Sequence, residues 1–416
     1  MIPFPGRSRV ARSSIILCLV WLGVAAGPSV VPTVLEAQTS GAPQAEPPRP
    51  WYERFSLRGY AQLRYNRFLE TNPDLTCSAC DRSIGNNNGL FLRRARLVLS
   101  GDPTDRTSIG LEIDYSTELA GQQYTLQLRT AYFDVFLDEA RVHRLRFGHV
   151  KLPFAFETLQ SSSQRLPLDR ADAINSGVPN ERDLGAFYLW SPAEARARFR
   201  AITDAGLKGT GDYGVLNVGI YNGQGGNRPE LNNNVHAVAR LAWPFQLPSR
   251  QFLELAVQGY HGRFVVPAAQ RSAGVTGPLE FEDERGAVSV ILFPQPLGLQ
   301  LEWNAGVGPE FDPLTNTIDS ERLEGGYVQT MYRTRLAGQS LIPFLRYQTF
   351  DGGKKGELDA RSYRVRETEF GIEWSPRAAL ELTVQYTISD RRYEDGLNPN
   401  NRQRGEFLRL QGQIAY

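Results

Sequence analysis

The most constraining feature of the chain is a two-residue alternation of apolar and polar side chains, which its last stretch shows clearly. Residues 404–416 read RGEFLRLQGQIAY. Apolar or small side chains occupy every second position from Leu408 to Tyr416, and Arg409 and two glutamines lie between them. Because successive side chains of a strand point to opposite faces, the pattern predicts a strand with one apolar and one wet face. A final strand that ends on an aromatic residue favours a closed membrane barrel, whose last strand pairs with its first and leaves no edge.

The same alternation recurs along the chain, which indicates an all-β fold. The sequence has 39 Gly residues and an aromatic content of 11%, as is typical of strands and turns. The phase of the alternation slips within residues 124–137, and this predicts a β-bulge. The predicted strands are 57–65, 94–99, 109–115, 124–137, 144–156, 235–243, 253–259, 288–292, 299–307, 328–332, 341–349, 370–374, 380–388 and 408–416.

The connections between these strands alternate between short and long. The short ones are 101–106, 138–141, 293–298, 337–339 and 375–379. The long ones are 69–88, 157–200, 223–233, 264–284, 309–322, 351–362 and 391–404. Transmembrane barrels place short turns on the periplasmic side and long loops outside. The chain is therefore predicted to form a transmembrane antiparallel β-barrel with long external loops, one of them (157–200) folded into the lumen.

The strand count depends on one ambiguous stretch. Residues 184–190 also have the pattern of a strand. If this stretch and residues 202–209 both crossed the membrane, loops 223–233 and 264–284 would change sides. Single-chain bacterial barrels have an even number of strands. We therefore predict about 16 strands with 184–190 inside the connection 157–200, and 18 strands as the alternative.

The N-terminal residues have the features of a signal peptide. Arginines at positions 7, 9 and 12 precede a short apolar run, residues 15–27, which is too short for a membrane helix. We predict a signal peptide over residues 1–37, with cleavage near Ala37 and Ala26 as the alternative. Cys18 lies in the apolar run, but Leu17 precedes it where a lipoprotein site would have a small residue.

A lead-in segment rich in Pro and Ala follows the signal peptide. Residues 38–53 are predicted to be a periplasmic lead-in, and 54–416 the outer-membrane barrel. Cys77 and Cys80 are the only cysteines after the predicted cleavage site. In an exported protein this spacing favours a disulfide over metal binding, and two unpaired thiols remain an alternative.

Charge and motifs argue against nucleic-acid binding and catalysis. The chain has 46 basic and 45 acidic residues, so its bulk charge points to no nucleic-acid partner. The four histidines have no metal-ligand spacing, and the sequence contains no nucleophile-elbow, zinc-protease or phosphate-loop motif. We expect no catalytic residues, no metal, no cofactor and no enzymatic activity.

Four segments give the chain a resemblance to a known family. They read FLRRARLVLSGD (91–102), TAYFDVFL (130–137), LRFGHVKLPFAFE (145–157) and DAGLKGTGDYGVLNVGIYNG (204–223). The third segment contains Gly148, Lys151, Pro153, Phe154 and Glu157, in the pattern Gly-x-x-Lys-x-Pro-Phe-x-x-Glu. Together the segments resemble the phosphate-selective porin O and P family. The resemblance implies an outer-membrane homotrimer of 16-stranded barrels with an anion-selective constriction.

The candidate pore residues are basic residues on inward-facing strand positions and in the long connection. The predicted pore-lining residues are Arg58, Arg64, Arg94, Arg96, Arg129, Arg144, Arg146 and Lys151, and those of the constriction loop are Arg165, Arg170 and Arg182. Glu112, Asp114, Glu367, Glu369 and Glu373 are expected to face inward as well. The chain has only four lysines, whereas the family members named for phosphate have a lysine cluster, so phosphate preference does not follow from the resemblance.

These patterns predict a porin in the bacterial outer membrane. It would form a water-filled channel for passive diffusion of small anions, with phosphate or polyphosphate among the candidate solutes. The alternatives are a non-conducting outer-membrane barrel with an adhesion or structural role, recognised by a plugged lumen, and a secreted soluble β-protein. The expected partners are small anionic solutes, outer-membrane lipid, other copies in a homotrimer, and the barrel assembly machinery, which would read the C-terminal strand.

Overall fold

A computed structural model describes residues 51–69, 89–116 and 125–416. Its strands are β1 Phe55–Phe68, β2 Gly89–Thr104, β3 Thr107–Ser116, β4 Thr125–Phe136, β5 His143–Lys151, β6 Arg182–Trp190, β7 Leu216–Tyr221, β8 His236–Gln246, β9 Phe252–Val265, β10 Glu280–Leu292, β11 Leu297–Asp312, β12 Thr317–Tyr332, β13 Thr334–Leu336, β14 Gln339–Gly353, β15 Ser362–Arg377, β16 Leu380–Glu394 and β17 Asn401–Ala415. The signal peptide (1–37), most of the lead-in (38–53), Cys77 and Cys80 lie outside the described residues, so their assignments stay predictions.

Helices are few and short. The α-helices are α1 Phe156–Leu159, α2 Asp172–Asn175 and α3 Ala193–Asp204, and the 3-10 helices are η1 Trp51–Arg54, η2 Pro179–Glu181, η3 Ala268–Gln270 and η4 Leu358–Ala360. Among the described residues, no helix has the length and apolar character needed to cross a membrane.

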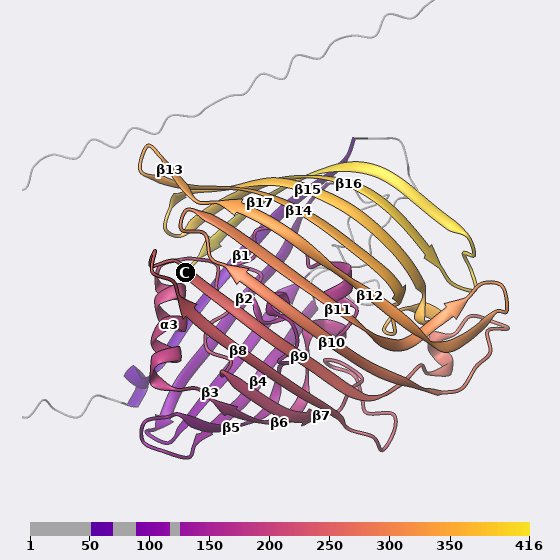
Figure 1. Cartoon of the computed structure of the whole chain (residues 1–416), viewed down its shortest axis with the longest axis horizontal. Coiled ribbons are helices and arrows are strands. Elements are labelled where there is room, and N and C mark those ends of the chain that lie inside the picture. The colour runs from indigo at the N-terminus through magenta and orange to yellow at the C-terminus, as the bar shows by residue number, and fades with distance from the viewer. Residues whose placement is uncertain (1–50, 70–88, 117–124) are drawn as a thin grey trace, which may run out of the picture. The chain divides into compact units, whose positions relative to one another are not determined.

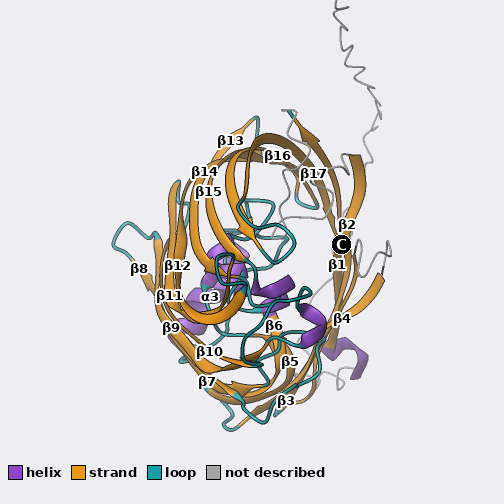
Figure 2. Cartoon of the chain, turned by 90° about the vertical axis from the view of Figure 1, so that its right-hand side faces the viewer, coloured by secondary structure: helices purple, strands orange, loops and turns teal. Residues whose placement is uncertain are grey.

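The strands form one closed antiparallel barrel (Figures 1 and 2). Each strand pairs with its neighbours along the chain, and β1 pairs with both β2 and β17. The short strand β13 continues β12 after Arg333, and both pair with β14. The 17 strands therefore make a barrel of 16 strands, as predicted.

The first and last strands meet at a close seam. The backbone N–H of Tyr416 donates to the carbonyl of Gly59 (3.0 Å), and the N–H of Gly59 donates to the carbonyl of Tyr416 (2.8 Å). A Cβ at Gly59 would lie 2.7 Å from the Tyr416 ring, so only glycine lets the ring pack here. The prediction that the C-terminal strand closes the barrel is confirmed.

The barrel is apolar outside and polar inside, the reverse of a soluble protein. Outward side chains such as Ile372 (47% exposed) and Val384 (48% exposed) leave apolar surface uncovered around the wall. Inward positions carry charge, and Arg346 and Arg391 are fully buried. A bulge at Arg129 produces the phase slip that the sequence predicted.

Connections alternate between the two rims of the barrel. One rim, here the long-loop rim, carries the segments 152–181, 222–235, 266–279, 313–316, 354–361 and 395–400. The opposite short-turn rim carries tight turns, such as the one between β15 and β16. The exception is 191–215, which contains α3 and lies on the short-turn rim.

Two assignments behind the strand count, 184–190 as part of a loop and 202–209 as a strand, were wrong. Residues 184–190 belong to β6, which pairs with both β5 and β7 and is part of the wall. Residues 202–209 are not a strand, because α3 extends to Asp204 and irregular backbone follows it. The two errors cancel, so the total of 16 is correct and the alternative of 18 is wrong.

Candidate functional site

The segment 152–181 between β5 and β6, here the inward loop, lies inside the barrel. Most of its side chains are buried, including those of α1 and most of α2. A loop normally runs over a protein surface. Figure 2 shows loops and short helices within the ring of strands. The prediction of a loop folded into the lumen is confirmed for residues 157–181.

Strand side chains hold the backbone of the inward loop. Glu302 of β11 accepts the backbone N–H of Phe156 at 2.6 Å, and Gln348 of β14 accepts that of Asp172 at 2.8 Å. Arg285 of β10 donates to the hydroxyl of Ser176 (2.8 Å). Buried backbone groups need such partners, so the wall of β10–β14 fixes the path of the loop.

Ion pairs hold the loop to further strands of the wall. Three loop carboxylates contact basic side chains of β1, β14, β16 and β17 and of the segment after β14. The pairs are Glu157–Arg346 (2.8 Å), Asp169–Arg64 (3.4 Å), Asp169–Arg409, Asp172–Arg391 (2.9 Å) and Asp172–Lys354. None of these side chains is more than 6% exposed, so water screens the pairs very little.

These water-shielded ion pairs, here called the dry network, also neutralise the carboxylates of β15. The pairs are Glu367–Arg391 (2.8 Å), Glu369–Arg346 and Glu373–Lys208 (2.6 Å). The three carboxylates face inward as predicted, but each has a buried cation beside it. They therefore do not present free negative charge to a solute.

The segment after β14 also enters the lumen. Lys355 donates to Asp283 of β10 and lies 5.0 Å from the centre of the Tyr260 ring. Burial lowers the pKa of Lys355 to about 8. With Lys354 on Asp172, two of the four lysines fasten this segment inside the barrel.

The side chains on the inner wall of β2–β6, here called the wetter wall, are more exposed to water than those of the dry network. The side chains of Glu112, Arg129, Arg144 and Glu181 are 12–16% exposed. Several of them also form ion pairs. The pairs on this wall are Arg96–Asp114 (2.6 Å), Arg96–Glu112 (3.0 Å), Arg182–Glu112 (2.7 Å), Arg182–Glu181 (2.8 Å), Arg170–Glu181, Arg129–Glu181 (3.7 Å), Arg144–Asp134 (3.9 Å) and Arg146–Asp134 (2.7 Å).

Three cations between this wall and the loop have only neutral partners. Arg94 donates to the Ser162 hydroxyl, and Lys151 donates to the carbonyls of Leu159 (2.8 Å) and Gln160 (3.0 Å). The Nε of Arg165 donates to a loop carbonyl at 3.1 Å. Among the described residues, no carboxylate lies within ion-pair distance of these three. Their charge is therefore not cancelled locally, and a low-dielectric lumen focuses it.

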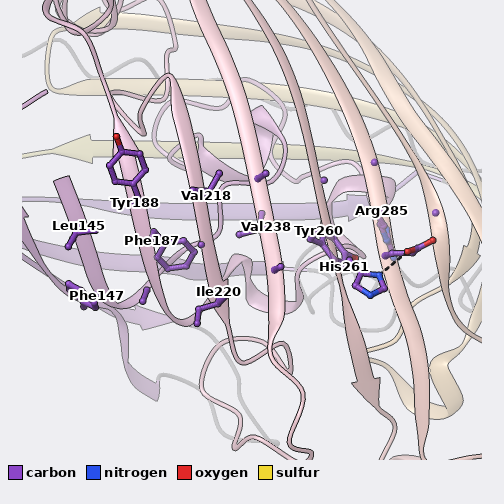
Figure 3. A pocket seen from close by; sticks show the side chains of 18 of the residues that line it. Leu145, Phe147, Phe187, Tyr188, Val218, Ile220, Val238, Tyr260, His261 and Arg285 are labelled. Carbon is purple, nitrogen blue, oxygen red and sulfur yellow. Dashed lines mark hydrogen bonds and ion pairs between the residues drawn. The ribbon is translucent and has the colours of Figure 1, made fainter. Parts of the chain in front are cut away.

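A separate hollow of about 850 Å³ lies on the outer wall (Figure 3). Its outward-facing lining includes Ile220, Ala237 and Gly286, and His261 pairs with Glu284 at one end (2.9 Å). These side chains point away from the lumen, so the hollow is not part of the pore.

A closed barrel with an apolar exterior, a polar interior and an inward third loop is the architecture of a porin. The family model of the phosphate-selective porin O and P matches residues 73–416. The chain belongs to the phosphate-selective porin O and P family. This confirms the resemblance seen in the four sequence segments.

Solved porins share the fold at low sequence identity. The outer-membrane channel DcaP of Acinetobacter baumannii aligns with a TM-score of 0.52 and 12% identity, over 87% of this chain and 97% of that one. OmpF of Salmonella typhi, in complex with daunomycin, aligns with a TM-score of 0.53 and 13% identity over the same shares. An anion-selective porin from Comamonas acidovorans aligns with a TM-score of 0.51 and 9% identity, over 87% and 99%. The search of curated proteins found no match.

The porin is an outer-membrane channel. Its family and fold place it in the bacterial outer membrane and indicate a channel rather than an enzyme. No group of His, Cys, Asp and Glu side chains in the described part of the porin could hold a metal ion.

The predicted pore residues divide into groups that the sequence could not distinguish. Arg64 lies in the dry network, and Arg58 is exposed on an inward-facing position near the short-turn rim. Arg94, Lys151 and Arg165 lack a carboxylate partner among the described residues, and so does the exposed Arg58. The predicted pore residues that form ion pairs at the wetter wall are Arg96, Arg129, Arg144, Arg146, Arg170 and Arg182.

Sequence reasoning missed the residues that position the inward loop. Glu302, Arg346, Arg391 and Arg409 all occupy inward-facing positions of strands that the alternation identified. A charged residue at an inward-facing strand position was therefore a usable signal for a loop anchor. Its partner in the loop could not be predicted, because the contacts join residues far apart in the sequence.

Proposed function

We propose that this porin is a passive diffusion channel with a modest preference for small anions, including phosphate. The observation that carries the proposal is the trio Arg94, Lys151 and Arg165, whose partners are neutral oxygens. They lie beside the wetter wall, where a hydrated ion has the best access. The carboxylates of β15 are paired in the dry network and offset this positive potential only weakly.

The expected size of the preference follows from Coulomb's law. One uncompensated charge about 7 Å from a permeating ion contributes about 0.6 kcal/mol in water, which is about threefold in local ion concentration. Charge-assisted hydrogen bonds from guanidinium groups add to the attraction of oxyanions. Nearby Glu112, Asp114 and Glu181 oppose it, so we expect phosphate block at millimolar concentration and no tight binding.

The test is the reversal potential of the channel in a planar bilayer under a salt gradient. Arg94→Gln combined with Arg165→Gln should lower the anion-to-cation permeability ratio by at least about threefold. Arg250→Gln, an exposed arginine in the turn between β8 and β9, is the charge-matched control and should leave the ratio unchanged. Cation preference in the wild type, or an unchanged ratio in the double variant, would refute the proposal.

The closed-lumen alternative also has a specific observation in its favour. The inward loop contacts both walls, because Ser162 accepts from Arg94 and its hydroxyl lies 2.6 Å from that of Tyr60. A non-conducting barrel would give no unitary currents in the same bilayer. Steady unitary currents from purified protein would exclude that role.

We also propose that the porin assembles as a homotrimer, as its family membership suggests. Chemical cross-linking in outer-membrane vesicles should yield a trimer band that persists on boiling, whereas without the cross-linker the trimer band should disappear on boiling. A monomer band alone, under conditions that cross-link a known trimer, would contradict the assembly.

A further inference from the structure

The outer wall of β15–β17 carries a row of arginines near the long-loop rim. Arg364 lies directly opposite Arg392, and Arg392 lies directly opposite Arg402, each pair on adjacent strands. Their side chains are 67%, 40% and 58% exposed. All three occupy the phase that points away from the lumen, because the residues beside them, such as Val365 and Arg391, are fully buried.

A second row lies two residues closer to the middle of the wall. Arg366 is opposite Asp390, and Asp390 is opposite Arg404. Asp390 accepts from Arg402 (2.8 Å) and Arg404 (2.9 Å), and Asp351 accepts from Arg364 (2.9 Å) and Arg366 (2.6 Å). Each aspartate is thus shared by two arginines. With the pair Arg392–Glu394, the patch holds five arginines and three carboxylates.

Like charges directly opposite one another weaken a sheet. Two consecutive Arg–Arg pairs in one row therefore oppose pairing of these strands, and Asp351, Asp390 and Glu394 offset the repulsion only in part, because five arginines share three carboxylates. A hollow of about 230 Å³ opens at this place, and its charged lining residues are Arg322, Arg364, Arg392, Glu310, Asp351 and Glu394. The patch thus combines positive charge, outward exposure and a concave surface.

The position of the patch identifies the source of the anion. Below the arginine rows the same strands present apolar side chains to the outside, with Phe370 opposite Tyr386, and Ile372 opposite Val384. Phe370, Ile372 and Val384 are 45–48% exposed and belong to the belt that contacts hydrocarbon. The arginines therefore border the belt at the depth where lipid headgroups lie.

We propose that this patch binds the phosphate-monoester headgroups of membrane lipids in the leaflet at the long-loop rim. A phosphate monoester carries up to two negative charges and three acceptor oxygens, which suits three guanidinium groups in a row. The planar fork of arginine binds phosphate through two parallel hydrogen bonds. This lipid contact is independent of conduction and of the lumen.

The test is binding of a bis-phosphorylated glycolipid to the purified protein in detergent micelles, followed by native mass spectrometry and by the thermal unfolding midpoint. The wild type should bind this lipid and unfold at a higher temperature in its presence. The variant R364Q/R392Q/R402Q should bind it at least about tenfold more weakly. The control R106Q/R250Q/R263Q removes three exposed arginines elsewhere on the barrel and should bind as the wild type does.

Three results would overturn the proposal. The first is equal binding of the same lipid after its phosphates have been removed. The second is unchanged affinity in the triple variant, with folding of that variant confirmed by its heat-modifiable migration on a gel. The third is equal stabilisation by inorganic phosphate at the same concentration, which would assign the site to a free anion instead of a lipid.

Discussion

Asp172 is the best single residue with which to test whether the inward loop sets the properties of the channel. It accepts from Arg391 at 2.9 Å and pairs with Lys354, and it is 1% exposed. Asp172→Asn removes a charge that two buried cations share. Breaking a buried ion pair costs about 3–5 kcal/mol. Arg391 keeps Glu367 as a partner (2.8 Å), so we expect the lower end of this range.

A loss of about 3 kcal/mol lowers the docking equilibrium of the loop about a hundredfold. The variant should therefore show larger unitary conductance, or rapid flicker between two levels, in single-channel recordings. Its unfolding midpoint in urea should also fall. Glu194→Gln is the matched control, because Glu194 is 64% exposed and its pair with Arg198 on α3 is a surface pair of small energy. If Asp172→Asn keeps the conductance, the noise and the unfolding midpoint of the wild type, the ion pairs do not hold the loop.

Three further predictions concern stability, assembly and orientation. The backbone N–H of Val142 donates to the carboxylate of Asp138 (2.9 Å) and holds the pKa of Asp138 below its ordinary value. This stabilisation is present above about pH 4 and is lost as pH falls through the folded-state pKa. Asp138→Asn should therefore lower the unfolding midpoint at pH 7, and the difference from the wild type should shrink as pH falls below about 4. Deletion of Ile414–Tyr416 removes the seam with β1 and should leave misassembled periplasmic protein, whereas normal insertion would contradict the role of the seam. Protease added to intact cells should cut within 264–284 and spare 375–379, and the opposite pattern would reverse the orientation.

The alternation of side chains was enough to predict the barrel, because period 2 reports directly on which face each strand residue occupies. It failed at α3, where Ala195, Phe199 and Ile202 recur at helical spacing. Ala195 and Phe199 pack near Trp190. The helical spacing is present in the sequence, but it lies next to a stretch with strand periodicity. The neighbouring strand β6 was then assigned to a loop in order to preserve the alternation of rims.

The alternation of side chains also predicted which basic residues lie on the inner wall. It could not predict which of them lack a carboxylate partner for their charge. Arg94 and Arg96 are two residues apart on the same face, yet Arg96 pairs with Glu112 and Asp114 while Arg94 contacts Ser162 of the inward loop. That difference depends on the path of the loop. The path is set by anchors on β10–β17, which no local pattern in residues 152–181 reveals.

The anchors of the inward loop also impose an order on assembly. Glu157 and Arg346 are 189 residues apart in the sequence, Asp172 and Arg391 are 219 apart, and Asp169 and Arg409 are 240 apart. Contacts of such separation form late, since the intervening chain must first be brought into place. The loop therefore acquires its last partner, Arg409, only when β17 is in the wall. Complete docking of the loop is thus a late event that reports completion of the wall.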